Sequence, residues 1–190
     1  MAVHGGDLTR DGDAEALVAE VVEASGRLDA VVHAVGPYRT APVSETPASA
    51  YRELMEGNLM TAVAITDASR EAVRQASGAY VFFGVAGLER WRARSVTTAY
   101  VAAKSALLCY VRGLAREEAP HGVRANMISP GFVPHDGAAP DTVAPDMHHK
   151  IPQGRPATME EVTGLASFLL SPSAGHLVGQ NIEVAGGWML

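Results

Sequence analysis

The chain has 190 residues, of which 47% are hydrophobic, so it carries enough apolar material for the core of one domain and is not intrinsically disordered. Its formal charge is −6, and its 15 basic residues are scattered among 21 acidic ones, which argues against a nucleic-acid partner. The longest apolar stretches run to about nine residues, short of the roughly 20 that span a membrane, and no secretory leader is evident, so we expect a cytoplasmic protein.

Short apolar runs alternate with longer runs of helical spacing, which predicts an α/β fold with a doubly wound parallel sheet. In the first half we expect strands at Ala2–His4 and Leu28–Val35, a helix over Ala14–Ala24 and a long helical pattern from about residue 47 to 76. The run at Leu28–Val35 is nearly continuous, as in a parallel strand buried on both faces. The long helix is expected to bend near Gly57-Asn58.

The second half continues the alternation and completes a single domain over residues 1–190. We expect strands at Ala79–Val85, Val123–Ile128 and Asn181–Val184, and helices at Thr98–Glu118 and Met159–Leu170. Residues 134–157 contain Pro134, Pro140, Pro145, Pro152 and Pro156, which is typical of a lid insertion over a substrate rather than of a regular element.

No metal site and no disulfide are predicted. Cys109 has no second cysteine to pair with, so we expect it to be a small core residue. His148 and His149 are adjacent and lack a spaced third ligand. Asp11 and Asp13 start a helix, because the other acidic ligands of a calcium loop are absent.

The most informative local pattern is the pair Tyr100 and Lys104 on the expected helix Thr98–Glu118. A spacing of four residues places the phenol and the ammonium on one helix face. A nearby cation favours the phenolate, so the pair could exchange a proton with a carbonyl or an alcohol.

Further motifs accompany this pair in order along the chain: Gly6-Asp7-Leu8-Thr9, His33-Ala34-Val35-Gly36, Asn58, Pro130-Gly131-Phe132-Val133, Gly179-Gln180 and Val184-Ala185-Gly186-Gly187. Together they resemble the short-chain dehydrogenase/reductase family, particularly the branch of 3-oxoacyl-[acyl-carrier-protein] reductases and pteridine-reductase-like proteins. The resemblance covers the whole chain. It implies a Rossmann-like fold and an NAD(P)(H)-dependent carbonyl/alcohol oxidoreductase.

The resemblance also implies roles for individual residues. Tyr100 would donate the proton in reduction, Lys104 would lower its pKa and hold the nicotinamide ribose, and Asn58 would position a relay water. The residues expected to bind NADP(H) or NAD(H) are Asp7, Leu8, His33, Gly36, Tyr100, Lys104 and Val133. The substrate would be a small carbonyl or alcohol, and the chain would form a homo-oligomer through the helices at 47–76 and 98–118.

Two departures from the family pattern accompany these matches. The family's first strand, its Gly-x-x-x-Gly-x-Gly turn, the following helix and its second strand have no counterpart, so we expect an N-terminally truncated form of the fold. That turn anchors the pyrophosphate of the cofactor. The family's strand order, 3-2-1-4-5-6, places both missing strands between Ala2–His4 and Leu28–Val35, so a gap between unpaired edges is expected unless these strands close up or another chain fills it.

The second departure concerns the family's catalytic serine. Local alignment puts Gly84 at its position, and the usual spacing from Tyr100 puts Gly87 there. Losing one such hydroxyl donor costs about 10²–10³ in rate, which slows a reductase without abolishing it. Ser95, Thr97 and Thr98 are the candidates that could replace it.

Two alternatives to the reductase stay open. One is a cofactor-free or regulatory relative, for example an enzyme that transfers protons without a hydride. The other is a non-catalytic partner that pairs with a full-length relative through the long helices. Retention of Asn58, Tyr100 and Lys104 together favours an enzyme over a purely structural partner.

Overall fold

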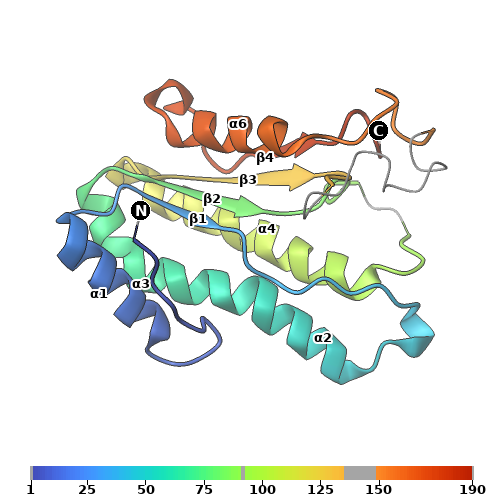
Figure 1. Cartoon of the computed structure of the whole chain (residues 1–190), viewed down its shortest axis with the longest axis horizontal. Coiled ribbons are helices and arrows are strands. Elements are labelled where there is room, and N and C mark those ends of the chain that lie inside the picture. The colour runs from blue at the N-terminus through green and yellow to red at the C-terminus, as the bar shows by residue number, and fades with distance from the viewer. Residues whose placement is uncertain (1, 91–92, 135–148, 190) are drawn as a thin grey trace.

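The computed structural model describes residues 2–90, 93–134 and 149–189. Four strands form one parallel sheet in the order β1-β2-β3-β4 (Figure 1). Their bounds are Ala30–His33 for β1, Ala79–Phe83 for β2, Arg124–Pro130 for β3 and Asn181–Val184 for β4. Because all four strands are parallel, their carboxyl ends meet at one edge of the sheet, where α/β folds place their ligands.

Helices cover both faces of this sheet, with α6 on one face and α3 and α4 on the other (Figure 1). The helices are α1 (Asp13–Ser25), α2 (Ala48–Met55), the π-helix η2 (Glu56–Met60), α3 (Thr61–Gln75), α4 (Thr98–Glu118) and α6 (Met159–Leu170). Three short 3₁₀ helices are η1 (Val43–Glu45), η3 (Ala119–His121) and η5 (Pro172–Ala174). This three-layer arrangement confirms the predicted α/β class.

The side chains of the central strands alternate between the two helical layers. Phe82 and Met127 are buried in the cluster that includes Leu107 of α4, whereas Val81 and Ile128 are buried against α6. Burial on both faces explains why these strands are nearly continuous apolar runs in the sequence.

Most predicted elements are confirmed, and α4, α6 and β4 have the predicted bounds. The strand expected at Leu28–Val35 is shorter, because its pairing with β2 covers Ala30–His33. The bend expected near Gly57-Asn58 is the π-helix η2, which joins α2 to α3. Single π turns inside helices are frequent at functional sites.

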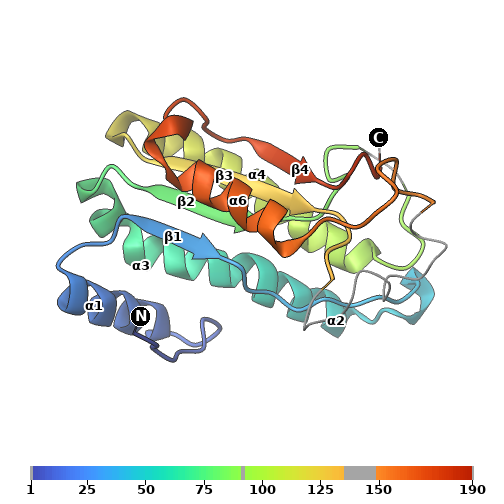
Figure 2. The ribbon, with the colours of Figure 1, turned by 45° about the horizontal axis from the view of Figure 1, so that its top comes forward.

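The strand predicted at Ala2–His4 is wrong, because this segment has no regular secondary structure. It is held by α1 instead: His4 Nδ1 lies 2.7 Å from Glu20 Oε2, and the amide of Asp7 donates to Asp13 Oδ2 at 2.8 Å. Figure 2 shows the N-terminal segment beside α1 and apart from β1. Within the described residues, β1 therefore pairs with β2 on one side and with no strand on the other.

The prediction that Cys109 is a core residue is also wrong, because its side chain is exposed. Leu107, Leu108 and Val111 face the core of the molecule, and a residue two positions beyond Leu107 lies on the opposite side of the helix. The sequence pattern around Cys109 is apolar on both sides, which concealed this orientation.

Residues 135–148, which make up most of the expected lid and include His148, lie outside the described residues. The part described after them is attached to the sheet edge, since the amide of Gln153 donates to Gly186 O and that of Ala157 to Phe132 O. In the described ranges no helix is long and apolar enough to cross a membrane. The same ranges hold no group of three or more His, Cys, Asp or Glu side chains suited to a metal ion.

Candidate active site

Helix α4 places Tyr100 and Lys104 one turn apart, beside the carboxyl end of β2. Lys104 is only 4% exposed, and its Nζ donates to the carbonyl oxygen of Phe83 at 2.8 Å. The same Nζ lies 5.8 Å from the centre of the Tyr100 ring. The spacing in the sequence therefore places a partly buried phenol beside a buried ammonium at the edge where ligands bind in this class of fold.

Burial dominates the proton affinity of both groups. It raises the pKa of Tyr100 to about 12, with a smaller contribution from Tyr38, and lowers the pKa of Lys104 to about 8. The net shift is upward because burial dominates, and Lys104 is not among its causes, so the lowering of the Tyr100 pKa by Lys104 stays a prediction. At neutral pH Tyr100 is protonated, which suits a proton donor.

Asn58 is fully buried in η2 and is held by two backbone carbonyls. Its Nδ2 donates to Pro37 O at 3.0 Å and to Leu54 O at 2.9 Å, while its Oδ1 has no partner among the described residues. Leu54 belongs to the apolar cluster that also contains Tyr100, so the amide is connected through packing to the α4 pair. An unsatisfied buried oxygen is a site where a water can bind.

His33 ends β1 and is almost fully buried, with its Nε2 at 3.0 Å from Thr61 Oγ1. Thr61 donates its own proton to Gly57 O, so the His33 Nε2 carries the hydrogen in this contact. Burial, assisted by the charge of Lys104, lowers the pKa of His33 to about 4. The ring is therefore neutral at physiological pH, and its unpartnered Nδ1 is an acceptor.

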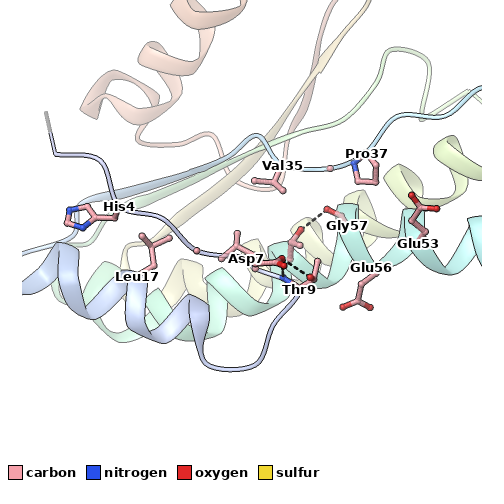
Figure 3. A pocket seen from close by; sticks show the side chains of 13 residues that line it. His4, Asp7, Thr9, Leu17, Val35, Pro37, Glu53, Glu56 and Gly57 are labelled. Carbon is pink, nitrogen blue, oxygen red and sulfur yellow. Dashed lines mark hydrogen bonds between the residues drawn. The ribbon is translucent and has the colours of Figure 1, made fainter.

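A cavity of about 660 Å³ opens beside these residues and is lined by three of the predicted cofactor residues, Asp7, Leu8 and Gly36 (Figure 3). Asp7 is oriented by Thr9, whose amide and hydroxyl both donate to its Oδ1. Asp7 with Glu53 and Glu56 gives the lining three carboxylates, and none of the lining residues is a Lys or an Arg. The space and the polar groups fit a nucleoside, but the lining supplies no anchor for a pyrophosphate.

Four predicted cofactor residues do not line this cavity: His33, Tyr100, Lys104 and Val133. Val133 follows β3 and packs in the cluster of Ile128 and Val162 on the α6 face of the sheet. Its side chain does not line the cavity that contains Asp7 and Gly36.

The position of the missing serine is filled by neighbours. A Cβ added at Gly84 would lie 2.5 Å from Ser129 Oγ, and one at Gly87, where φ is +79°, would lie 2.7 Å from the Arg94 guanidinium. Ser129 donates to Asn181 Oδ1 at 2.6 Å. The candidate Thr98 is engaged too, since its hydroxyl donates to Arg94 O. A serine at either glycine would require these side chains to move.

Sequence reasoning missed Tyr38, which touches the candidate catalytic tyrosine. The rings of Tyr38 and Tyr100 meet edge to face, with centroids 4.9 Å apart. The sequence does show an aromatic residue directly after the Gly36-Pro37 turn. Its contact with α4, however, depends on the path of the following loop and cannot be predicted from the sequence.

Comparison with known proteins identifies the family to which the chain belongs. The family model described as enoyl-(acyl carrier protein) reductase matches residues 1–189. L-fucose dehydrogenase of Bos taurus is 32% identical over 191 residues, which are 95% of this chain and 69% of that protein. The short-chain reductase protein NovJ of Streptomyces niveus is 30% identical over 182 residues, 90% of this chain and 68% of that protein. The chain belongs to the short-chain dehydrogenase/reductase family, a family of oxidoreductases.

Solved structures show the same fold. An NADH-dependent reductase, A1-R′, responsible for alginate metabolism, superposes with a TM-score of 0.87 at 22% identity and covers all of this chain and 76% of that one. A blue fluorescent protein from a metagenomic library, in complex with NADPH, superposes with a TM-score of 0.88 at 24% identity, over 97% of this chain and 74% of that one. The predicted Rossmann-like sheet is thereby confirmed.

Proposed function

We propose that the chain is an NAD(P)(H)-dependent carbonyl/alcohol oxidoreductase that uses Tyr100, Lys104 and Asn58 as a proton relay. The observation that carries this proposal is the pair of partly buried Tyr100 and buried Lys104 at the carboxyl edge of the sheet, with Nζ 5.8 Å from the ring centre. Both solved neighbours are described with a nicotinamide cofactor, which supports the cofactor class but not the choice between NADH and NADPH.

In the direction of reduction, the Tyr100 hydroxyl gives its proton to the carbonyl oxygen. The nicotinamide, when bound, supplies the hydride to the carbonyl carbon. Lys104 then stabilises the phenolate that remains, because its ammonium is the nearby positive charge and is held in place by Phe83 O. Asn58, whose Oδ1 has no partner among the described residues, would position the water through which the phenolate regains a proton.

The cofactor would occupy the cavity of about 660 Å³ with its nucleoside against Asp7, Leu8 and Gly36, and His33 beside it. The nicotinamide ribose would lie near Tyr100 and Lys104, and the backbone at Val133 would contact the nicotinamide. No Lys or Arg belongs to the lining, and the neighbouring Arg10 and Arg39 are engaged in ion pairs with Asp7 and Glu53. We therefore expect weaker binding than is usual for a nucleotide held by a glycine-rich turn.

The test combines binding with turnover. We expect NADPH or NADH to bind the folded chain in a calorimetric titration and to be consumed in the presence of a carbonyl substrate. Tyr100→Phe, which keeps the ring and removes the hydroxyl, should lower kcat by about 10²–10⁴ and affect cofactor binding much less. Tyr51→Phe is the matched control, because Tyr51 lies in the same apolar cluster. Undiminished turnover by Tyr100→Phe would overturn the proposal.

A cofactor-free relative that only transfers protons is the second candidate, and the absence of Lys and Arg from the cavity lining favours it. The same titration separates the two. A folded chain that binds neither NADPH nor NADH, yet loses a proton-transfer activity in Tyr100→Phe, would be this second kind of enzyme.

We also propose that the chain is a homo-oligomer through the outer faces of the helices at 47–76 and 98–118. Support comes from the exposed side chains of Met55, Met60 and Cys109 on these helices. Sedimentation should then give a mass of at least twice that of the chain, and the thiol of Cys109 should react more slowly as the protein concentration rises.

A further inference from the structure

Tyr38 is an exposed aromatic residue at the candidate catalytic tyrosine. Its side chain is 66% exposed, although its ring meets that of Tyr100 edge to face at 4.9 Å and an interplanar angle of 87°. The residue before it is fixed, because Pro37 O accepts a hydrogen bond from the buried Asn58. Tyr38 therefore presents most of its surface to solvent from an anchored position beside Tyr100.

Two further exposed apolar side chains lie in the segments that follow Tyr38 and precede α4. Val43, 58% exposed, begins η1 after the Tyr38 loop, and Val96, 43% exposed, precedes α4. The two segments are joined where the amide of Ala41 donates to Val96 O at 2.7 Å. We call Tyr38, Val43 and Val96 the apolar rim.

Next to Tyr38, the guanidinium of Arg39 lies 3.8 Å from the carboxylate of Glu53, which offsets its charge. The rim thus exposes carbon surface next to a proton donor, and burying such surface under a ligand is favourable. A polyhydroxylated ligand such as a sugar needs hydrogen-bonding partners, and the rim side chains offer one phenolic hydroxyl and two aliphatic groups.

We infer that Tyr38 positions the substrate and determines its class: a carbonyl compound that carries a flat apolar group, preferably an aromatic ring, packed on Tyr38 while its oxygen meets Tyr100. This inference rests on the proposed function, in which Tyr100 donates the proton. It predicts a preference unlike that of the bovine relative, which is named for L-fucose.

Tyr38 has a second effect, because it covers the ring that carries the proton. The titratable groups around the Tyr100 ring are Lys104 on its own helix, Tyr38 on the loop and Tyr51 of α2 in the same apolar cluster. Removing the Tyr38 ring opens that side of the Tyr100 ring to water and removes a neighbouring phenol. Both changes make the phenolate easier to form.

The first arm of the experiment measures substrate preference. The probes are 1-phenyl-1,2-propanedione and 2,3-butanedione, which differ by a phenyl group in place of a methyl group, with L-fucose and NAD(P)⁺ as the sugar probe. The wild-type chain should reduce the phenyl diketone with a kcat/KM about tenfold above that for butanedione and should leave L-fucose unoxidised. Tyr38→Ala should remove this preference through a higher KM, whereas Tyr38→Phe should keep it.

The second arm needs neither substrate nor cofactor. The ionisation of Tyr100 is followed by its near-ultraviolet absorbance, as the difference between chains with and without Tyr100→Phe. Tyr38→Ala should shift this ionisation to lower pH, and the control Tyr51→Phe should leave it in place. An unshifted titration in Tyr38→Ala would show that Tyr38 does not cover Tyr100 and would overturn the inference.

The two hypotheses fail in different ways. If the wild-type chain is active and loses activity in Tyr100→Phe, but Tyr38→Ala keeps the phenyl preference, the inference is overturned and the proposed function stands. Efficient oxidation of L-fucose also overturns the inference alone. A wild-type chain that reduces neither diketone and oxidises no sugar, or a fully active Tyr100→Phe variant, overturns the proposed function and with it the role of Tyr38 in substrate choice.

Discussion

Three neighbouring side chains at the carboxyl edge of the sheet have their proton affinities set by burial. Tyr100 keeps its proton to about pH 12, the pKa of Lys104 falls to about 8, and that of His33 to about 4. In each case the neutral form is favoured, as expected where water is excluded. A site of this kind holds a protonated phenol and an uncharged imidazole at neutral pH, which is the state that proton donation to a carbonyl requires.

His33 gives a prediction at this scale, because its neutral form is favoured only in the folded chain. Below pH 6.5 the unfolded chain takes up a proton that the folded chain resists until about pH 4. The free energy of unfolding should therefore fall as the pH drops through this window, by on the order of 2–3 kcal/mol from this residue, and the contribution should be complete above pH 6.5. His33→Asn should flatten this part of the acid limb in urea unfolding followed by circular dichroism.

The control for this prediction is His176→Asn, since His176 is exposed. It should keep the pH dependence of the wild-type chain. The comparison uses slopes against pH and not absolute stability, because His33→Asn also changes the packing beside Thr61. Equal slopes for the wild-type chain and His33→Asn would show that another group governs the acid limb.

At the scale of elements, the turn after β1 and the π-helix η2 fit together without space for a side chain. Gly36 has a φ of +141°, and a Cβ there would lie 2.2 Å from Asn58 Oδ1. Gly57 of η2 contacts the same turn, since its Cβ would lie 2.3 Å from Pro37 Cδ. This close approach lets Asn58 reach Pro37 O and fixes the loop that carries Tyr38.

Gly36→Ala should therefore destabilise the fold by about 2–4 kcal/mol, from backbone strain together with the clash. Gly12→Ala is the matched control: φ is +88° there, but no atom lies within 4 Å of an added Cβ, so only the strain of about 1 kcal/mol is expected. Urea unfolding measures both. Equal losses for the two variants would show that contact with Asn58 does not constrain the turn.

Local periodicity explains which elements could be predicted. Helix α4 and its Tyr100–Lys104 pair follow from spacing within one segment, and so do the bounds of α6. Ala2–His4 has a strand-like sequence, but whether it pairs depends on a neighbouring strand, and α1 holds it instead. Ser129 occupies the space that a side chain at position 84 would need. This proximity depends on the pairing of β2 with β3 and cannot be predicted from the local sequence.

On the scale of the whole molecule, the edge of the sheet formed by β1 leaves apolar surface exposed. Helix α6 packs on β2 and β3, and Val32 of β1 is 47% exposed. Between β1 and α1 lies an apolar cavity of about 310 Å³, lined among others by Leu17, Val21 and Val31. Parallel strands are ordinarily covered on both faces, and an uncovered apolar edge is a template for pairing with another chain. Self-association through β1 is the expected consequence.

A charge on this edge should suppress such association with little effect on the fold. Val32→Lys replaces a half-exposed side chain, so the free energy of unfolding should change by no more than about 0.5 kcal/mol. Light scattering on heating should nevertheless begin at a higher temperature, because a lysine on an edge strand opposes pairing with a second copy. Phe168→Lys is the control, since Phe168 is comparably exposed but lies on α6. If both variants delay scattering equally, the effect comes from net charge and not from the edge of β1.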